Sequence, residues 1–528
     1  MFLAIPLVLV VYTHLWNAVG FPTIHPDEGY YIGRSIHVSD GLGPKEDTAR
    51  YDHPYFGWLF LGSIFNLIGY PDSGNPTPGD SNSIERIWLF PRLAMGILAV
   101  IDTFFIYKIA ERRYNRNVAF IAAILFAVMP YTWLIRRVLL EPIQIPFLLT
   151  SILFALYSGT KTKTKTKTNT KTKAEQKSEL KGNYGGQKIM SNQNVILLLS
   201  SGIFLGLTIF TKIPAITLIP LIGFIVFTNN KKSFKALGIW IVPVILIPLM
   251  WPIHALSAGD TEHWLDDVIW QATERPESSL DNSLRDLLRI DPVLIVLGSA
   301  GFVYAALRKD PLIILWIIPF IIFFYFVGRI TYNYWVPLLP AFCIGSSVLI
   351  IGLSNKILRI SNLVGRILPF AVITSIAIFG LIINVKLISS DLTSSQIKAA
   401  AFVQYQLNNE KLVQNNNVPS SSNVTVISGP NYSWVFKYVF NENNILDNFR
   451  DRKPIDTEKF IMITDVPYKT FLRRDNTDRS ERLEALFDNT VSLAKFEGNA
   501  SKYDYDKYPY FSIRQGRSGS EIDIRSNY

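Results

Sequence analysis

Long apolar blocks constrain the fold of this chain more than any other feature of its sequence. Of the 528 residues, 49% are hydrophobic, and they gather in continuous stretches rather than alternating between two faces. Runs of about 17–25 apolar residues can cross the roughly 30 Å hydrocarbon core of a bilayer. Because blocks of this kind form helices, which satisfy their own backbone groups in lipid, the sequence predicts an all-α polytopic membrane protein.

About eleven transmembrane spans are predicted. The first is interpreted as a retained helix, because it lacks the basic start and the small-residue cleavage site of a signal peptide. The single cysteine, Cys343, lies within an apolar run and has no second cysteine with which to form an intrachain disulfide. The predicted spans cover residues 2–20, 88–109, 118–135, 142–158, 194–210, 213–228, 236–253, 291–307, 311–328, 334–353 and 365–388.

Basic residues between the spans predict the orientation. The net charge of +10 is divided among short connections, which argues against a nucleic-acid-binding face. Lys and Arg in short loops mark the cytoplasmic side of a membrane protein. With eleven spans, all the basic connections fall on one side, namely those containing Arg112, the segment 159–193, Lys231, Arg308 and Lys356.

The chain is predicted to have two domains. Residues 1–388 form a transmembrane domain, with outer loops at 21–87 and 254–290 and a cytoplasmic linker at 159–193. The linker contains the run TKTKTKTKTNTKTK, which is too repetitive to present a defined site. We interpret it as a solvated linker, with contact to anionic lipid headgroups as the alternative.

The tail from residue 389 to 528 differs in composition from the rest of the chain. Short β-like runs at Val424–Ser428 and Phe460–Thr464 alternate with polar and helix-like stretches, which predicts a small extracytoplasmic α/β domain. Three glycosylation sequons support an outer location only weakly, because such triplets are common by chance in Asn-rich sequence. They begin at Asn423, Asn431 and Asn499.

The first candidate site follows span one. Asp27 and Glu28 lie at the start of the first outer loop and are flanked by aromatic residues. A second polar cluster, Tyr51-Asp52-His53-Pro54-Tyr55, comes later in the same loop. Adjacent acids in a loop are often only solvated, but ionisable groups beside a bilayer are candidates for function.

The second candidate site is the short connection between spans three and four, on the same side as Asp27. Arg136, Arg137 and Glu141 must lie near the membrane surface there. Arg137 and Glu141 could instead form a structural salt bridge between positions i and i+4 of a helix. That bridge would not exclude a role in an active site.

Three further residues are predicted on the same side. Lys212 lies between spans five and six, and Arg329 and Tyr332 follow span nine. The cations could be side chains that reach the membrane surface by snorkelling. Together with the acidic pair they suit an anionic, lipid-linked substrate, because Arg and Lys can hold a phosphate and stabilise its charge.

The order of these motifs resembles that in the GT-C superfamily of membrane glycosyltransferases. The closest likeness is to the branch with protein O-mannosyltransferases and the bacterial aminoarabinose transferase for lipid A. The Asp-Glu pair after the first helix matches Asp27-Glu28, and the later His-Pro-Pro-like motif matches His53-Pro54, with Tyr55 replacing the second Pro. Arg92 matches an Arg early in the second helix, and residues 137–141 match an Arg-x-x-Leu-Leu-Glu-like motif. The likeness covers roughly the first 230 residues well.

The resemblance implies a glycosyltransferase that moves a sugar from a polyprenyl- or dolichyl-phosphate donor, with mannose as one candidate sugar. Asp27 would be the general base, and Glu28 and Glu141 would orient the acceptor, the donor or a metal. Arg136, His53 and Tyr332 are further candidate substrate-binding residues. The cations implied at the lipid phosphate are Arg137 with Arg92, Lys212 or Arg329.

Other interpretations stay open at this point. An oligosaccharyltransferase catalytic subunit shares the architecture, but the tail lacks its Trp-Trp-Asp-type motif. A transporter or lipid flippase would place polar groups at mid-membrane and often shows internal repeats. No cofactor is certain; a divalent cation could be held by Asp27, Glu28 and Glu141. The expected partners are the lipid-linked sugar, membrane lipids and a protein, lipid or glycan acceptor, with no nucleic acid. In a prokaryote the enzyme would lie in the cell membrane.

Overall fold

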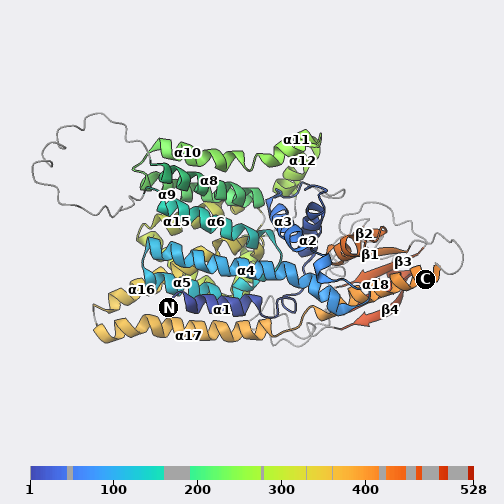
Figure 1. The fold of residues 1–528 in the computed structure, drawn as a ribbon. Helices are drawn as coiled ribbons and strands as arrows, with labels where there is room; N and C mark the ends of the chain where they lie inside the picture. Colours follow the sequence, from blue (N-terminus) through green and yellow to red (C-terminus); the bar gives the residue numbers. More distant parts are fainter. Residues whose placement is uncertain are drawn as a thin grey trace, which may run out of the picture.

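A computed structural model describes residues 2–44, 51–159, 191–274, 279–328, 330–359, 361–414, 424–447, 459–465, 487–497 and 521–528. Within these ranges the chain forms a bundle of long helices, followed by a small sheet domain beyond one end of the bundle (Figure 1). The fold class predicted from the sequence is therefore confirmed.

Each predicted span coincides with an apolar helix or with a pair of consecutive helices. By length and composition, six helices of the described residues can cross a membrane, or up to eight if each of two bent pairs is one span. Four further apolar helices are shorter. The helices of the bundle are α1 (Ala4–Leu15), α4 (Ser81–Arg113), α5 (Arg116–Val128), η2 (Pro130–Arg136), α6 (Leu140–Tyr157), α8 (Asn192–Thr211), η3 (Ile213–Leu218), α9 (Ile219–Asn229), α10 (Phe234–Leu246), α14 (Pro292–Leu307), α15 (Pro311–Val327), η5 (Tyr332–Leu338), α16 (Leu339–Ile357) and α17 (Asn362–Ile388).

The predicted outer loops contain helices of their own. The segment 21–87 forms α2 (Pro26–Ser39) and α3 (Phe56–Ile68), and the segment 254–290 includes α12 (Thr261–Ile269) and α13 (Leu280–Ile290). The helix α11 (Met250–Ser257) joins α10 to this second segment. Figure 1 places α2, α3, α11 and α12 at the same end of the bundle, on the side of the sheet domain.

Helix α4 links the bundle to the sheet domain. Its 33 residues make a helix about 50 Å long, which exceeds the roughly 30 Å core of a bilayer. The first turns therefore project past the other helices, where Trp88 meets Trp434 of the tail edge to face, with ring centroids 5.1 Å apart. This contact joins the tail to the end of the bundle where α2 lies (Figure 1).

The tail combines the helices α18 (Ser394–Gln414) and α19 (Pro430–Trp434) with a five-stranded sheet of order β2-β1-β3-β5-β4. Strand β1 is parallel to its neighbours β2 and β3, whereas β5 is antiparallel to the central strand β3 and to β4. Two strands agree with the sequence prediction, namely β1 (Thr425–Ser428) and β3 (Phe460–Thr464). The other strands are β2 (Ile445–Asp447), β4 (Val491–Phe496) and β5 (Ile522–Ser526).

The sequons carry little information about location. Asn431 is completely buried and donates a hydrogen bond from its side-chain amide to Asp465, 3.0 Å away, so this side chain cannot carry a glycan in the folded protein. Asn423 and Asn499 lie outside the described residues. The division of the chain at residue 388 stays a prediction, and α17 ends at that residue.

Candidate active site

Helix α2 begins in a way that fixes Asp27 in its first turn. His25 is the N-cap: its ring Nδ1 accepts from the backbone amide of Asp27 at 3.2 Å, and Glu28 accepts from the backbone amide of His25 at 2.9 Å. Pro26 occupies the first helical position, where its fixed φ suits the helix. The side chain of Asp27 is 49% exposed, and its carboxylate lies 3.7 Å from the ring of His25. It is therefore the accessible member of the acidic pair.

Glu28 is buried by an ion pair with Arg92. Both side chains are inaccessible to solvent, and Nη2 and Nε of Arg92 donate to the two carboxylate oxygens of Glu28 at 2.9 and 3.1 Å. Burial alone would raise the pKa of Glu28, but the Arg92 charge and hydrogen bond outweigh it, with help from Arg137 and the His25 amide. The pKa of Glu28 is consequently held below its ordinary value of 4.5.

Arg92 has a second set of partners that ties the outer loop to the bundle. Its Nη1 donates to the backbone carbonyls of Ala18, Val19 and Pro22, at 3.3, 2.8 and 2.7 Å. Glu28 in turn accepts from the backbone amide of Val138 at 3.1 Å. The pair therefore joins the end of α1, the start of α2, helix α4 and the connection before α6.

Arg136 also acts on backbone carbonyls. Its guanidinium donates to the carbonyls of Thr13, Trp16 and Asn17, which end α1, and to that of Phe21. A cation in this position satisfies carbonyl groups that have no partner within the helix. Only 1% of Arg136 is exposed, so the structure places it in the scaffold beneath the site rather than on a surface.

Arg137 lies next to the start of α2. Its Nη2 donates to the carbonyl and hydroxyl oxygens of Thr23, at 3.3 and 3.1 Å, and its guanidinium lies 4.9 Å from the ring centroid of Trp133. Its backbone is extended (φ −79°, ψ 146°), whereas Glu141 belongs to the first turn of α6. The two residues therefore do not share the helical i, i+4 geometry that the sequence suggested as an alternative.

Glu141 forms a buried ion pair with Lys212. The Lys212 Nζ lies 2.6 Å from the Glu141 carboxylate and 4.4 Å from the centroid of the Tyr334 ring. Burial would lower the pKa of Lys212, but the charges of Glu141 and Asp27 and the Tyr334 hydroxyl raise it above its ordinary value. Lys212 is therefore a cation, and Asp27 is near enough for its charge to act on it.

Tyr31 lies within range of the charges of both acidic candidates, Asp27 and Glu141, and of the second polar cluster. Burial raises the pKa of its hydroxyl well above the ordinary value, and the negative charges of Asp27, Glu141 and Asp52 raise it further, against the effect of Arg34. The ring stacks on Trp58, with centroids 6.5 Å apart, and lies 6.4 Å from the His53 ring. The Tyr31 hydroxyl thus stays protonated among three carboxylates.

The second polar cluster of the outer loop, residues 51–55, forms hydrogen bonds both to α2 and to the segment around α12. Asp52 accepts from Arg34 of α2 at 2.8 Å, and the Arg34 guanidinium lies 5.0 Å from the Trp58 ring centroid. Tyr51 donates from its backbone amide to Asp267 at 2.6 Å and from its hydroxyl to Asp260 at 3.0 Å. His53 is therefore held between α2 and the segment around α12.

Comparisons with known proteins agree with this architecture. Residues 5–261 match the sequence model of the Alg9-like mannosyltransferase family. The oligosaccharyltransferase AglB from Archaeoglobus fulgidus, solved with an inhibitory peptide and a dolichol-phosphate, superposes with a TM-score of 0.52 at 13% identity, covering 89% of this chain and 69% of that chain. ArnT from Cupriavidus metallidurans in the apo state gives 0.52 at 12% identity, covering 100% of this chain and 97% of that chain. No curated protein matches the sequence.

The chain has the fold of the membrane glycosyltransferases AglB and ArnT, and just under half of it matches the Alg9-like mannosyltransferase family. The resemblance inferred from the sequence motifs is thus confirmed, and so is the prediction of a multi-pass membrane enzyme. At 12–13% identity, the likeness to the solved structures shows the fold alone. The roles of single residues must therefore be argued from the geometry of this chain.

Arg329 and Tyr332 are the two candidate residues not yet placed. Arg329 lies outside the described residues. Tyr332 begins η5, and its backbone carbonyl accepts from the Tyr131 hydroxyl at 2.5 Å, which positions the segment that carries Tyr334. Sequence reasoning missed Tyr31 and Arg34 as members of the site. Their spacing in the same helix as Asp27 was the available signal, because residues three or four apart share a helix face.

The acids do not form a metal-binding group. Among the described residues, no set of three or more His, Cys, Asp or Glu side chains could hold a metal ion. Glu28 and Glu141 are directed to different cations, Arg92 and Lys212, so they do not converge with Asp27 on one point. The residues present therefore do not fit the divalent cation that the sequence left open.

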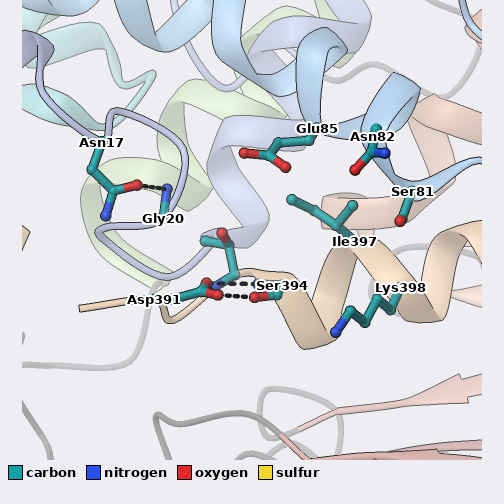
Figure 2. Close-up of a pocket in the computed structure, with 10 residues that line it drawn as sticks. Asn17, Gly20, Ser81, Asn82, Glu85, Asp391, Ser394, Ile397 and Lys398 are labelled. Carbon is teal, nitrogen blue, oxygen red and sulfur yellow. Dashed lines mark hydrogen bonds between the residues drawn. The ribbon is translucent and has the colours of Figure 1, made fainter. Parts of the chain in front are cut away.

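A separate pocket of about 290 Å³ lies between the start of α4, the connection after α1 and the start of α18. Figure 2 shows Glu85, Asp391 and Lys398 among its lining residues, and Asp391 accepts a hydrogen bond from the backbone amide of Ser394 at the start of α18. None of the candidate site residues lines this pocket. The pocket lies where the tail meets the bundle, and it has no part in the proposed reaction.

Proposed function

We propose that this enzyme transfers a hexosyl group from a polyprenyl- or dolichyl-phosphate donor to a hydroxyl group of a protein, lipid or glycan. The observation that carries the proposal is the half-exposed carboxylate of Asp27 beside the buried Glu141–Lys212 pair, at the end of the helix bundle. In this arrangement the charge of an accessible base, Asp27, acts on a buried cation, Lys212.

Asp27 is the proposed general base. A base must come within hydrogen-bonding distance of the acceptor hydroxyl, and Asp27 is accessible where Glu28 is not. As the acceptor oxygen forms its bond to the anomeric carbon, its proton passes to the Asp27 carboxylate. The bond between that carbon and the donor phosphate oxygen breaks, and its electron pair stays on the phosphate. A single displacement of this kind inverts the configuration.

Lys212 and Arg137 are the proposed contacts of the departing phosphate, with Arg329 retained as a further candidate. A cation next to the leaving group stabilises the negative charge that grows there. Lys212 is already positioned by Glu141 and Tyr334. Glu28, Arg92 and Arg136 are given a positioning role instead, because Glu28 and Arg92 bind each other and both arginines bind backbone carbonyls between residues 13 and 22.

Tyr31, His53 and Asp52 are proposed to bind the sugar. Carboxylates accept hydrogen bonds from sugar hydroxyls, and a protonated Tyr31 can donate one. The match to the Alg9-like mannosyltransferase family supports mannose as the sugar. The dolichol-phosphate in the AglB structure supports the class of donor.

The proposed orientation puts the basic end of the bundle in the cytoplasm. The connection after α6 meets the start of α8 and the end of α9 through hydrogen bonds from Asn194 to Asn230 and from Asn230 to Ser158, at 2.7 and 3.1 Å. The turns that follow α9 and α16 lie at the end opposite the sheet domain (Figure 1). The site and the tail would then face the outside of the membrane.

The test is a mass-spectrometric comparison of glycans, glycolipids and glycoproteins from cells with and without the gene. The proposal expects one class of acceptor to lose a hexose residue and the unused lipid-phosphate sugar to accumulate. A transporter or flippase would instead change the distribution of an intact lipid across the membrane without loss of a particular glycosidic bond, and that result would overturn the proposal.

A further inference from the structure

A second pocket lies at the opposite end of the helix bundle from Asp27. Its volume is about 350 Å³, and it opens between the α4–α5 turn, the α14–α15 turn and the last turns of α16. The sequence marked this end only by its basic residues. Three of these cations, Arg113, Arg308 and Lys309, line this one pocket, although they come from two distant turns of the chain.

The pocket keeps a positive charge after its internal contacts are counted. Asp310 is the single carboxylate among the lining residues, and it lies 3.1 Å from Arg113. Asp310 also accepts from the Tyr114 hydroxyl at 2.7 Å and caps the start of α15. It therefore holds Arg113 at the rim, while Arg308 and Lys309 remain as uncompensated charge among the lining residues.

A buried hydroxyl in the pocket wall lacks a partner. The Tyr304 OH is buried and has no hydrogen-bond partner within the described residues. It lies against Gly352, where an added Cβ would be 2.1 Å from this oxygen. Both residues line the pocket, and the Arg308 guanidinium lies 5.1 Å from the Tyr304 ring centroid. A buried polar group without a partner is costly, so an acceptor atom of a ligand would satisfy it.

The backbone conformation at Lys309 is one that glycine adopts more easily than lysine. Lys309 adopts the left-handed conformation, with φ at +54°, directly after the end of α14. Glycine is the relaxed residue at such a position, because it has no Cβ to clash. Replacing Lys309 by glycine would therefore remove a cation from the pocket without straining the backbone.

Helix α14 has an exposed apolar stripe that ends beside the pocket residue Arg308. Val296, Val303 and Leu307 of α14 are 58%, 54% and 80% exposed, and their spacing of seven and four residues puts them on one face of the helix. Leu307 is followed directly by Arg308. An acyl chain that lies along this stripe would bring its headgroup to the cations, which a free phosphate ion would not require.

We propose that this pocket binds the phosphate of an anionic membrane lipid. The phosphate oxygens would accept from Arg308, Lys309 and the Tyr304 hydroxyl, while the acyl chains pack along α14. Basic pockets between transmembrane helices are suited to anionic headgroups. The site is separate from the proposed donor site and does not depend on it.

Native mass spectrometry of the purified full chain tests this proposal. The protein is titrated with phosphatidylglycerol, with phosphatidylcholine and with inorganic phosphate alone. We expect one phosphatidylglycerol to be retained about tenfold more tightly than phosphatidylcholine, the usual worth of a charge-assisted contact. Inorganic phosphate at millimolar concentration should not displace it. Equal retention of the two lipids, or displacement by inorganic phosphate, would overturn the proposal.

Variants separate a defined site from diffuse surface charge. Lys309→Gly removes a cation while easing the backbone, so weaker retention of the lipid cannot be attributed to misfolding. Tyr304→Phe removes the buried hydroxyl and should also weaken retention. Lys356→Gln is the matched control, because Lys356 is an exposed cation at the same end that does not line the pocket. An equal loss in the control and in Lys309→Gly would show that no defined site exists.

Discussion

At the residue scale, the two acids of the Asp27-Glu28 pair have different environments although they are adjacent. Glu28 is enclosed by Arg92 and by backbone amides, whereas the Asp27 carboxylate is half exposed and its charge acts on Lys212 and Tyr31. The difference follows from helix geometry, because neighbouring residues point about 100° apart around a helix. One acid can therefore fix the loop while the other does chemistry.

Glu28→Gln should reduce stability. Removing one partner of a buried ion pair leaves Arg92 uncompensated and should cost about 3–5 kcal/mol. Because the pKa of Glu28 is lowered, the pair stabilises the fold above the ordinary value of 4.5 and loses this effect as the pH falls through the lowered pKa. The gap between wild type and variant, measured by unfolding in detergent, should therefore narrow on acidification.

Glu85→Gln is the control for this experiment, because Glu85 is an exposed carboxylate on the same helix as Arg92. It should leave stability unchanged at either pH. A Glu28→Gln variant that is as stable as wild type but inactive would instead assign Glu28 to the chemistry.

Arg137→Ala should weaken use of the donor more than it disturbs folding. Loss of a charge-assisted phosphate contact costs about 1.5–3 kcal/mol, which corresponds to an increase of about tenfold or more in the KM for the lipid donor. Steady-state kinetics at varied donor concentration measure this change, with Arg116→Ala at the opposite end of the bundle as control. An unfolding temperature that falls while the donor KM stays the same would make Arg137 a structural residue.

At the scale of elements, helix α2 is the part that positions the site. It packs directly on α19 of the tail, and Gly29 permits the approach: a Cβ there would lie 1.9 Å from the carbonyl oxygen of Pro430. Gly33, one turn later, faces Trp434 and Tyr438 at 3.2 Å in the same way. The tail therefore supports the helix that carries Asp27.

Gly29→Ala should loosen this contact. The carbonyl of Pro430 is backbone and cannot move aside cheaply, so we expect a loss of about 1–3 kcal/mol and faster proteolysis of the tail. Gly238→Ala in α10 is the matched control, since no atom lies within 4 Å of the added Cβ, and it should be tolerated. Unchanged proteolysis of Gly29→Ala would show that the α2–α19 contact does not hold the tail.

The elements differ in how well the sequence predicts them. The apolar blocks predict the helices of the bundle, and β-branched residues predict β1 and β3, because these signals are local. Residues 56–68 are predicted as part of an outer loop, because thirteen apolar residues are too short to span a bilayer. The structure shows that they form the helix α3. The partners of Arg92 and Arg136 could not be predicted, because the carbonyls they bind lie 70 or more residues away.

At the scale of the whole molecule, the two ends of the bundle have different chemistry. Asp27, Lys212 and the tail lie at one end, whereas the basic turns and the 350 Å³ pocket lie at the other. In the proposed mechanism the donor binds from the leaflet at the Asp27 end, and the lipid proposed for the basic pocket lies in the opposite leaflet.

Cysteine labelling of intact cells tests this orientation. The native Cys343 is completely buried and should stay silent to a membrane-impermeant maleimide. Tyr528→Cys, in the tail, should be labelled, whereas Lys356→Cys, at the basic end, should be labelled only after the cells are opened. The reverse pattern would put the proposed active site in the cytoplasm.

The central claim is that Asp27 is the base for transfer from a lipid-phosphate sugar. The most direct measurement is release of polyprenyl monophosphate from a labelled polyprenyl-phosphate mannose by the purified chain, with membranes from cells lacking the gene as the source of acceptor. Asp27→Asn keeps the size and removes the base, so turnover should fall about 10²–10⁴-fold while donor binding and the unfolding temperature stay unchanged. Turnover near the wild-type rate in Asp27→Asn would contradict the account.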